Sequence, residues 1–428
     1  MKKLLLFTGS FPFSAASENT FLPQEIGELA KCFDVIQVIP VSNSGAHEDL
    51  VLPNVEVNEN YANFIRDKKK LFWAKIRALI SPEFWWEAGK FIVRYPRNFS
   101  TLRYLAFFHA QARLTVEWLK NEVEKKITAG DKVVLETWWC DFTSFGMASY
   151  ARARKNVVSV SRVHGYDLYE QRRSPAFIPF RRKTLRLLDL VFADSTAGAR
   201  YLRTRYPEFA KKVLVGLIGI YRPERLTRRS NDGVFRIVSC SFLIQLKRVD
   251  LLIRGLGKVL EKSPGIRIEW VHIGSGPEKA KLVDLACAVL GPGFPCRFLD
   301  YPGKEQVERF YQDQSVDLFV NLSTTEGTPV SIMEAISHGV PVLATAVGGN
   351  KEIVDSSNGL LVGENPEENE VADAILSFVL GRLDCDQLRK GSLAKWDASH
   401  NAEKVYKEFC GQVLNSLNEK KALVGPTR

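Results

Sequence analysis

Short runs of apolar and β-branched residues alternate with amphipathic stretches along most of the chain. In the first half these runs lie at 4–9, 35–41, 132–139, 157–163, 190–195 and 213–219. Between the first two runs, residues 21–31 carry the apolar spacing of a helix. This alternation predicts a mostly parallel sheet that is covered by helices on both faces.

A polar, arginine-rich stretch at 223–233 interrupts the pattern, which then starts again. The later apolar runs lie at 235–242, 266–274, 296–301, 316–323 and 340–345, and the chain looks helical from about residue 367. We therefore predict an α/β protein with two Rossmann-like, doubly wound domains. Their predicted bounds are 1–222 and 234–400, with a linker at 223–233 and a terminal segment at 401–428.

The composition is that of a folded, soluble protein, because 45% of the 428 residues are apolar and 25% are charged. No run of 18 uncharged apolar residues occurs, so no transmembrane helix is expected. The first apolar run is short and is followed by Gly9 and Pro12, which favours an opening strand over a signal peptide. The seven scattered cysteines form no C-x-x-C pair and the six histidines show no H-E-x-x-H spacing. We therefore expect no disulfides and no metal site, and a cytoplasmic location.

The net charge of +10 is distributed unevenly. Residues 1–230 hold 37 Lys and Arg against 23 Asp and Glu, whereas residues 231–428 hold 22 against 26. This asymmetry indicates two domains with different partners. A basic first half suits nucleic acid, an anionic membrane or a phosphorylated substrate, and a solubilising surface is the simpler alternative.

The segment at 323–354, STTEGTPVSIMEAISHGVPVLATAVGGNKEIV, carries the densest candidate chemistry. Pro329 can occupy the first turn of a helix, and the free N–H groups of residues 330–332 then form an anion site. Glu326 lies in the preceding loop and Glu334 one turn into the helix. Two carboxylates so placed can bracket a polyhydroxylated ligand, because they accept hydrogen bonds from sugar hydroxyls.

The alternative is that both glutamates are ordinary surface acids near a helix start. The surrounding glycines weigh against that interpretation. They stand at positions 327, 339, 348 and 349, where loops and strand entries require a tight turn or a close approach of the backbone to a ligand. The segment as a whole therefore favours a ligand site.

This segment resembles the E-x7-E signature of glycosyltransferase family 4, the retaining GT-B enzymes of glycosyl transferases group 1. EGTPVSIMEAISHGVPVLAT follows the family's usual E-G-x-P-x-x-x-x-E-A-x-x-x-G-x-P-V run, with Glu326 and Glu334 at the two glutamates. The resemblance implies that Glu326 contacts the transferred sugar and that Glu334 holds the nucleotide ribose. It also implies that the backbone between them binds the donor, at Gly327, Thr328, Val330 and Ser331.

A second match, SFLIQLKRVDLLI at 241–253, departs from the family at one position. The family usually has an arginine and a lysine there, which grip the donor diphosphate, and Lys247 keeps the lysine. Phe242 stands where the arginine normally is, and phenylalanine cannot hold phosphate oxygens. Arg248 is one candidate replacement; another arginine, or weakened donor binding, is the alternative.

The stretch HIGSGPEKAKL at 272–282 resembles the family's glycine turn near the nucleotide base, which places Gly274 in the donor site. The donor base, in UDP or GDP, stays open. The resemblance implies no cofactor and no metal, since cations and helix N–H groups serve at the leaving diphosphate.

In the first half, SRVHGYDLYEQR at 161–172 follows a predicted strand. His164 resembles the family's histidine near the donor sugar and the acceptor. Its place at a strand end favours this role over a structural one, because ligands bind beyond the carboxyl ends of strands in doubly wound sheets. Arg162 and Asp167 are candidate acceptor-binding neighbours. Glu18, in the first loop, could bind an acceptor hydroxyl or equally cap a helix.

The stretch at 64–108 interleaves Lys and Arg with Trp, Phe and Ile. A basic, aromatic, amphipathic surface suits an anionic membrane. The equal alternative is that its aromatic residues form core and its cations a solvated face. No recognised nucleic-acid module accompanies it, so nucleic acid is not an expected partner.

Together these features predict a metal-independent hexosyltransferase that moves a sugar, with retention, from a nucleotide sugar to a glycan or lipid-linked acceptor in surface polysaccharide synthesis. Glu326, His164 and Lys247 are the candidate catalytic residues. The resemblance implies a cleft between the domains and a last helix, within 401–428, that crosses back to the first domain. The expected location is the cytoplasm, peripheral on the inner face of the cell membrane. A non-catalytic sugar-nucleotide-binding scaffold and a GT-B epimerase stay as alternatives.

Overall fold

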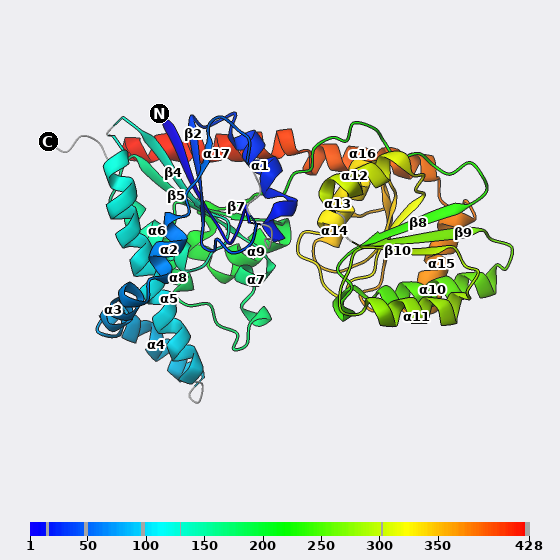
Figure 1. Cartoon of the computed structure of the whole chain (residues 1–428), viewed down its shortest axis with the longest axis horizontal. Coiled ribbons are helices and arrows are strands. Elements are labelled where there is room, and N and C mark those ends of the chain that lie inside the picture. The colour runs from blue at the N-terminus through cyan, green and yellow to red at the C-terminus, as the bar shows by residue number, and fades with distance from the viewer. Residues whose placement is uncertain (14–16, 47–49, 96–98, 129, 301–302, 424–428) are drawn as a thin grey trace. The chain divides into compact units, whose positions relative to one another are not determined.

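The computed structural model describes residues 1–423 apart from 14–16, 47–49, 96–98, 129 and 301–302 (Figure 1). The chain divides into two compact units. Unit 1 contains Met1–Leu217 and Glu403–Arg428, and unit 2 contains Ile218–Ala402. Each unit is built around one parallel sheet, so the predicted pair of doubly wound α/β domains is confirmed.

Unit 1 has a seven-stranded parallel sheet in the order β3-β2-β1-β4-β5-β6-β7. Its strands are β1 (Lys2–Thr8), β2 (Val35–Pro40), β3 (Val55–Val57), β4 (Lys132–Thr137), β5 (Val157–Val163), β6 (Leu190–Ala193) and β7 (Val213–Val215). Its helices are α1 (Leu22–Leu29), α2 (Asn60–Arg66), α3 (Lys68–Leu79), α4 (Pro82–Arg94), α5 (Phe99–Trp118), α6 (Phe142–Ala151), α7 (Gly165–Leu168), α8 (Arg181–Leu187), α9 (Thr196–Arg205) and α17 (Ala402–Leu423).

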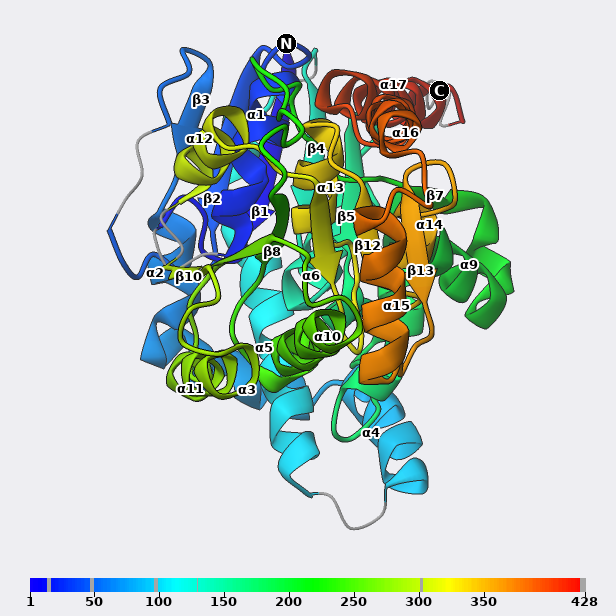
Figure 2. The same cartoon turned by 90° about the vertical axis from the view of Figure 1, so that its right-hand side faces the viewer.

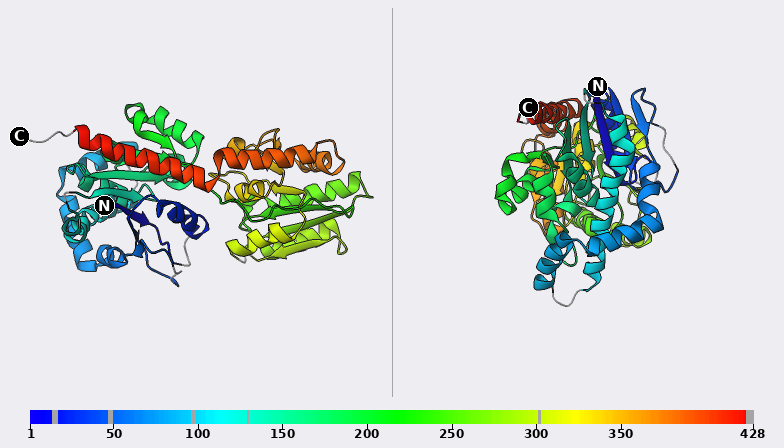
Figure 3. Two further views of the ribbon diagram at one scale, coloured as in Figure 1. Left: turned by 90° about the horizontal axis from the view of Figure 1, so that it is seen from above. Right: turned by 90° about the vertical axis from the view of Figure 1, so that its left-hand side faces the viewer.

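Both faces of this sheet are covered, which explains why its strands are apolar throughout rather than alternating. In β4, Val133 and Leu135 join the core cluster under α5, α6 and α9, whereas Val134 joins the cluster under α1 and α17. The helix α17 contributes Phe409 and Val413 to the second cluster. The last helix of the chain, red in Figure 3, is therefore part of the core of unit 1.

Unit 2 has a six-stranded parallel sheet in the order β10-β9-β8-β11-β12-β13. Its strands are β8 (Phe235–Cys240), β9 (Ile268–Ile273), β10 (Cys296–Leu299), β11 (Leu318–Asn321), β12 (Val342–Thr345) and β13 (Gly359–Val362). Its helices are α10 (Val249–Lys262), α11 (Lys279–Leu290), α12 (Lys304–Asp313), α13 (Val330–Ser337), α14 (Asn350–Ile353), α15 (Glu368–Val379) and α16 (Cys385–Ser399).

Helices also cover both sides of the sheet in unit 2. On one side α10, α11 and α15 pack through Ile253, Leu282 and Ile375 against Ile237 and Leu318 of the sheet. The helices α12 and α13 lie on the other side (Figures 1 and 2). The loops that leave the carboxyl ends of the strands are thus held between two helical layers.

Each sheet has a point where the strand order reverses. In unit 1 this point lies between β1 and β4, and in unit 2 between β8 and β11. Ligands of doubly wound sheets bind beyond the carboxyl ends of the strands at such a point. The fold therefore specifies one candidate location in each unit.

The stretch at 223–233, predicted as a linker, is instead part of unit 2. Thr227 donates its hydroxyl to the carbonyl oxygen of Tyr311 at 2.7 Å. The Asp317 carboxylate accepts the backbone N–H of Ser230 at 2.9 Å. A polar, arginine-rich sequence resembles a linker in composition, but these long-range hydrogen bonds fasten it to the sheet.

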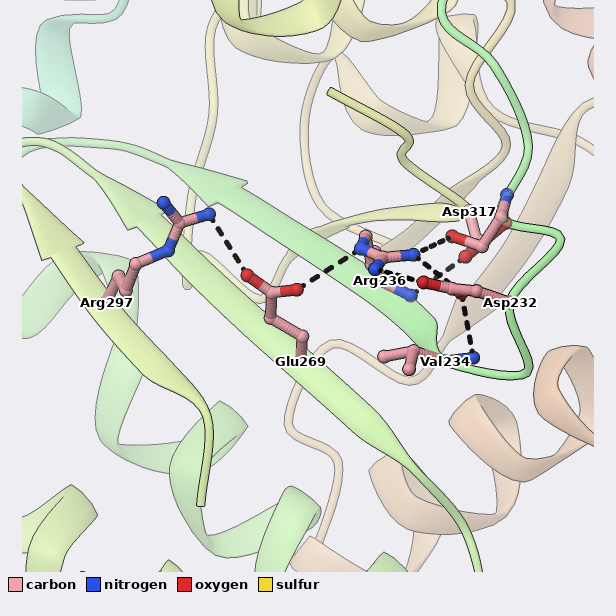
Figure 4. A network of polar contacts seen from close by, with 7 residues as sticks. Asp232, Val234, Arg236, Glu269, Arg297 and Asp317 are labelled. Carbon is pink, nitrogen blue, oxygen red and sulfur yellow. Dashed lines mark hydrogen bonds and ion pairs between the residues drawn. The ribbon is translucent and has the colours of Figure 1, made fainter. Parts of the chain in front are cut away.

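A network of arginines and carboxylates joins the amino ends of three neighbouring strands in unit 2 (Figure 4). Arg236 of β8 bonds Asp232 at 2.6 Å and Glu269 of β9 at 3.2 Å, and Glu269 also accepts from Arg297 of β10 at 3.0 Å. The bond to Asp232 raises the pKa of the Arg236 guanidinium. This network lies at the end of the sheet opposite to the switch-point loops, so it supports the scaffold rather than the site.

All eleven apolar runs that predict strands form strands, and two further strands, β3 and β13, were not predicted. The strand β3 has three residues, all partly or fully exposed, at one edge of its sheet. The strand β13 is a four-residue edge strand that begins at a glycine. Such short edge strands carry too few residues for a clear hydrophobic period.

Candidate functional site

A narrow pit of about 10 Å³ lies at the switch point of unit 2, between β8 and β11. Residues that follow these strands line it, among them Ser241, Lys247, Arg248, Leu322 and Ser323. The pit is too small for a whole ligand. It forms the floor of a site on which the loops after both strands converge.

Lys247 and Glu326 meet beside this pit, although 79 residues separate them. The Oε1 atom of Glu326 accepts hydrogen bonds from Lys247 Nζ at 2.7 Å, Ser323 Oγ at 2.6 Å and Asn321 Nδ2 at 3.1 Å. The Glu326 side chain is 9% exposed and that of Lys247 21%. The carboxylate is therefore held in one orientation, and the ammonium group can still reach an incoming anion.

The Arg248 guanidinium is hydrogen-bonded to backbone carbonyl groups of the surrounding loops. Its Nε donates to the carbonyl oxygen of Leu322 at 2.6 Å, and its Nη2 donates to those of Ser323 at 3.1 Å and Glu364 at 2.8 Å. Burial lowers the pKa of this guanidinium. This geometry argues against Arg248 as the replacement for the family arginine at Phe242, whose own side chain is 64% exposed. Arg248 instead joins the loops after β8, β11 and β13.

Glu334, on α13, is held in an environment that favours its neutral form. Burial raises its pKa to about 7; Lys304 opposes this rise and Glu308 adds to it. The buried Tyr311 hydroxyl has no hydrogen-bond partner among the described residues, and its pKa is raised by burial, by Cys240 and by Glu334. An unpaired buried hydroxyl is costly, so this corner is suited to a polar ligand.

The N-terminus of α13 offers fewer free N–H groups than the sequence predicts. Pro329 is the residue before the helix rather than its first residue, and its carbonyl oxygen accepts the N–H of Ile332 at 3.0 Å. The prediction that residues 330–332 are all free is therefore wrong at Ile332. Within the described residues, Val330 and Ser331 keep unpaired N–H groups, and both residues are partly exposed, as are Gly327 and Thr328.

Glycines bring three loops of this site into direct backbone contact. A Cβ atom on Gly348 would lie 1.9 Å from the carbonyl oxygen of Glu326, and φ at Gly348 is +43°. On Gly349 it would lie 2.0 Å from the oxygen of Gly327. Gly274, after β9, has φ of +144° and would place a Cβ 1.9 Å from the oxygen of Ser241. Only glycine fits these positions, so these residues set the shape of the site.

The carboxylate of Glu18 occupies the switch point of unit 1, between β1 and β4. Its carboxylate accepts the backbone N–H groups of Gly9 at 2.7 Å, Ser10 at 3.0 Å and Phe11 at 3.0 Å, and also the indole N–H of Trp139. Glu18 is 2% exposed. The carboxylate is therefore committed to the loop after β1, which argues against the predicted contact with an acceptor hydroxyl.

Arg162 is also a structural residue rather than an acceptor-binding one. Its guanidinium forms ion pairs with Glu25 and with Glu136 and donates to the carbonyl oxygen of Gly216 at 3.3 Å. All three charged side chains are at most 2% exposed. Burial, together with the charge of Glu136, raises the pKa of Glu25 to about 8 in spite of Arg162. A fully buried cluster cannot contact an acceptor.

His164 and Asp167 lie together after β5, but they differ in whether their polar side-chain atoms already have hydrogen-bond partners. Asp167 accepts the N–H of His164 at 2.6 Å and that of Cys140 at 2.6 Å. Its carboxylate is committed to the backbone, which argues against the acceptor-binding role that the sequence predicts. The His164 ring lies 4.9 Å from Trp138 and 4.8 Å from Trp139, and its Nδ1 has no partner among the described residues. Burial and the nearby guanidinium lower its pKa to about 3, so the imidazole is neutral.

The sequence interpretation missed three residues that shape the site in unit 2. Asn321 and Ser323 orient Glu326, and Tyr311 brings its unpaired hydroxyl from α12. Ser323 directly precedes the recognised loop and could have been suspected. Nothing local distinguishes Tyr311 or Asn321, whose neighbours come from other elements.

Within the described ranges, no helix is both long and apolar enough to cross a membrane. In the same part of the chain, no group of three His, Cys, Asp or Glu side chains is placed to hold a metal ion. Metal independence stays a prediction.

Residues 235–380 match the model of the family described as glycosyl transferases group 1. The match runs from β8 through α15, and so contains Lys247, Glu326 and Glu334. This match covers 146 of the 428 residues. It confirms the resemblance of the E-x7-E segment to glycosyl transferases group 1, whereas the assignment to family 4 stays a prediction.

Relatives and solved structures extend the similarity over the rest of the chain. The putative colanic acid biosynthesis glycosyltransferase WcaL of Salmonella typhimurium is 26% identical over 293 residues, which cover 63% of this chain and 67% of that protein. The lipopolysaccharide outer core galactosyltransferase WaaB has a TM-score of 0.67 at 12% identity, over 98% of this chain and 99% of that one. For Anabaena Alr3699/HepE, solved in complex with UDP, the TM-score is 0.63 at 17% identity, over 97% and 100%.

At these identities the solved structures show the fold, which is that of GT-B glycosyltransferases, as predicted. The matched segments span from one third to two thirds of the length of the curated relatives.

Proposed function

We propose that the protein is a retaining glycosyltransferase of family 4 that transfers a hexose from a UDP or GDP sugar. The contact between Lys247 and Glu326, at the switch point of the group 1 domain, is the observation that carries this proposal. A cation and a carboxylate side by side suit a ligand in which an anionic diphosphate adjoins sugar hydroxyls. WcaL is a putative glycosyltransferase, and Alr3699/HepE binds UDP.

In this mechanism Lys247 and the N–H groups of Val330 and Ser331 stabilise the leaving diphosphate. Glu326 accepts hydrogen bonds from the transferred sugar, and Glu334 accepts them from the ribose. Among the described residues around Glu326 no side chain is an evident nucleophile, so the acceptor attacks from the face that the diphosphate leaves, and a phosphate oxygen takes the acceptor proton. Neutral His164 is the candidate catalytic residue of unit 1. The proposal includes no cofactor and no metal.

A screen of sugar nucleotides by thermal unfolding tests the donor assignment. A ligand at a hundred times its Kd stabilises the protein by about 2.7 kcal/mol. Slow donor hydrolysis without acceptor supports a transferase, binding without any turnover supports the scaffold alternative, and release of an epimerised sugar nucleotide supports the epimerase. If no UDP or GDP sugar shifts the transition, the proposal is wrong.

The affinity for a sugar nucleotide is expected to be about tenfold weaker at pH 6 than at pH 8. Burial raises the pKa of Glu334 to about 7. Ribose hydroxyls donate to the ionised carboxylate, so binding favours the form that is lost as the pH falls below 7. Titration calorimetry with a UDP sugar measures this, because neither phosphate of the diester titrates in that range.

In Glu334→Gln the affinity should be lower at pH 8, by about 1.5–3 kcal/mol as for hydrogen bonds to charged groups, and it should no longer vary with pH. The same pH profile in the glutamine variant would show that Glu334 does not hold the ribose.

We further propose that the acceptor is a lipid-linked sugar or glycan for a surface polysaccharide, and that unit 1 binds the inner face of the cell membrane. The helices α3 and α4 support this, since they expose large apolar side chains that we call the α3–α4 surface. Its members are Phe72, Trp73, Leu79, Ile80, Trp85, Trp86, Ile92 and Val93, with Trp86 73% and Val93 86% exposed. Basic residues flank them, including Lys68, Lys69 and Lys70 at the start of α3.

Reversing Lys68, Lys69 and Lys70 to glutamate is expected to weaken binding to anionic vesicles by about a hundredfold or more. Each basic residue at an anionic surface contributes about 1 kcal/mol, and salt screens this over about 10 Å at 0.1 M. Co-sedimentation with vesicles at several salt concentrations measures the effect. Affinity for sugar nucleotide should not change.

A matched control reverses Lys125, Arg152 and Arg200, which are exposed elsewhere in unit 1. Equal weakening by both triple variants, or equal binding to neutral and anionic vesicles, would count against the membrane proposal and favour a soluble acceptor.

A further inference from the structure

A cavity of about 410 Å³ opens between α3, α5 and α6 of unit 1. Its lining residues lie on helices and on the turn after α5, and none lies in the loops at the carboxyl ends of the strands. The volume is in the range of small-molecule sites. Nothing in the proposed transfer reaction uses it.

The cavity has an apolar floor. Ala74 of α3, Ala112 and Val116 of α5, and Phe145 and Gly146 of α6 line it. A Cβ atom on Gly146 would lie 2.5 Å from the carbonyl oxygen of Ala112, so α5 and α6 approach as closely as backbones can here. This close packing keeps the apolar residues of the two helices next to each other in the lining.

Charged side chains also line the cavity, and the basic Arg77, Arg113 and Lys120 outnumber the acidic Glu83 and Glu117. Arg77 is paired with Glu117 at 4.0 Å. Arg113 and Lys120 are exposed and make no hydrogen bond or ion pair within the described residues. Two unpaired cations beside apolar lining residues favour a ligand with an anionic head and an apolar body.

His109 supplies a second, independent observation. It lines the cavity, is 2% exposed, and its Nδ1 has no hydrogen-bond partner in the described part of the chain. Its Nε2 lies 3.8 Å from a carboxylate oxygen of Glu83, and its ring stacks on Phe180 with 5.1 Å between the ring centres. A buried, unpartnered ring nitrogen is costly. A phosphate oxygen accepts a hydrogen bond from Nδ1 when this nitrogen carries a proton, and a phosphate O–H donates to it when it does not.

We propose that this cavity binds the phosphate group of an anionic lipid. Arg113, Lys120 and His109 hold the phosphate, and the first carbons of the lipid lie on the floor formed by Ala112 and Phe145. The cavity shares α3 with the exposed Phe72 and Trp73, which favours a lipid over a free phosphate ester as the source of the phosphate. The site does not depend on the nucleotide-sugar site of unit 2.

Titration calorimetry of the full chain with soluble dihexanoyl phosphatidic acid, and separately with glycerol 3-phosphate, tests this site. We expect saturable binding of the short-chain lipid and weaker binding of glycerol phosphate. The double variant Arg113→Gln, Lys120→Gln should weaken lipid binding at least tenfold. His109→Phe, which keeps an aromatic ring against Phe180, should weaken it as well.

Lys125→Gln, an exposed lysine outside the cavity, is the matched control and should bind as the unmodified protein does. Equal affinities for the two ligands would show that the bound phosphate group belongs to a soluble phosphate ester and not to a lipid. No binding of either ligand, or equal weakening by the control, would overturn the site. Thermal unfolding verifies that each variant is folded. If His109→Phe is unstable, the test depends on the double variant Arg113→Gln, Lys120→Gln, which changes only exposed residues.

Discussion

Replacing Lys247 by alanine is expected to lower turnover of a nucleotide sugar by about 10²–10³-fold, the range for losing one donor to a developing anion. The side chain bonds Glu326 at 2.7 Å and lines the pit. Binding of the sugar nucleotide should weaken far more than binding of the nucleoside, because the lost partner is the diphosphate. Initial rates of nucleoside diphosphate release and calorimetry with both ligands measure this.

Two comparisons sharpen this prediction. Lys258→Ala removes a lysine of α10 whose ion pair, among the described residues, is with Glu261 on the same helix, and should leave turnover unchanged. Arg248→Ala should reduce nucleoside and sugar-nucleotide binding alike and lower the melting temperature, since its guanidinium holds loop carbonyls. Normal turnover in Lys247→Ala would remove this lysine from the mechanism.

Replacing Arg162 by alanine is expected to lower the free energy of unfolding by about 3–5 kcal/mol, because it leaves two buried carboxylates without their cation. Glu25 and Glu136 are fully buried, and each has a second oxygen with no partner among the described residues. The guanidinium also packs 4.3 Å from the ring centre of Phe409, on α17. Urea unfolding followed by circular dichroism measures the loss.

The loss in Arg162→Ala should grow as the pH rises from about 7 to about 10. Burial already raises the pKa of Glu25 to about 8 and raises that of Glu136, and without the cation both values rise further. In the unmodified protein the fall of stability with rising pH ends once the pH passes these pKa values, whereas in the variant the folded state continues to bind more protons than the unfolded state and continues to lose stability. Arg152→Ala, on the surface after α6, should change stability by less than about 0.5 kcal/mol. A pH-independent loss would indicate that packing on Phe409, not charge, explains the effect.

The loop around Glu326 shows how far sequence reasoning reaches. The order of glycines, proline and glutamates between 323 and 354 predicts a strand, a polar loop and a helix start, and the structure has all three. The same segment carries the resemblance that the group 1 match confirms. Local spacing suffices there because these residues act through backbone geometry within one stretch of chain.

The basic stretch at 64–108 shows where pattern alone is ambiguous. Its composition fits both a membrane surface and a core, and the structure contains both. Phe84 and Phe91 are buried in α4, whereas Trp85 and Trp86 of the same helix are 57% and 73% exposed. Adjacent aromatic residues on a helix point in different directions, so only the packing of α4 against its neighbours separates them.

The sequence by itself determined the two α/β domains, eleven of the strands and the place of the candidate nucleotide-sugar segment. Only the tertiary structure decided which charged residues are available. Glu18, Arg162 and Asp167 look free in sequence, but their partners lie up to 137 residues away and use their charges inside unit 1. It also decided that Lys247 reaches Glu326 and that Arg248 does not face outward. Hydrophobic periodicity shows which face of an element is buried. The hydrogen-bond partners of a polar side chain, by contrast, come from distant parts of the chain that only the fold places next to it.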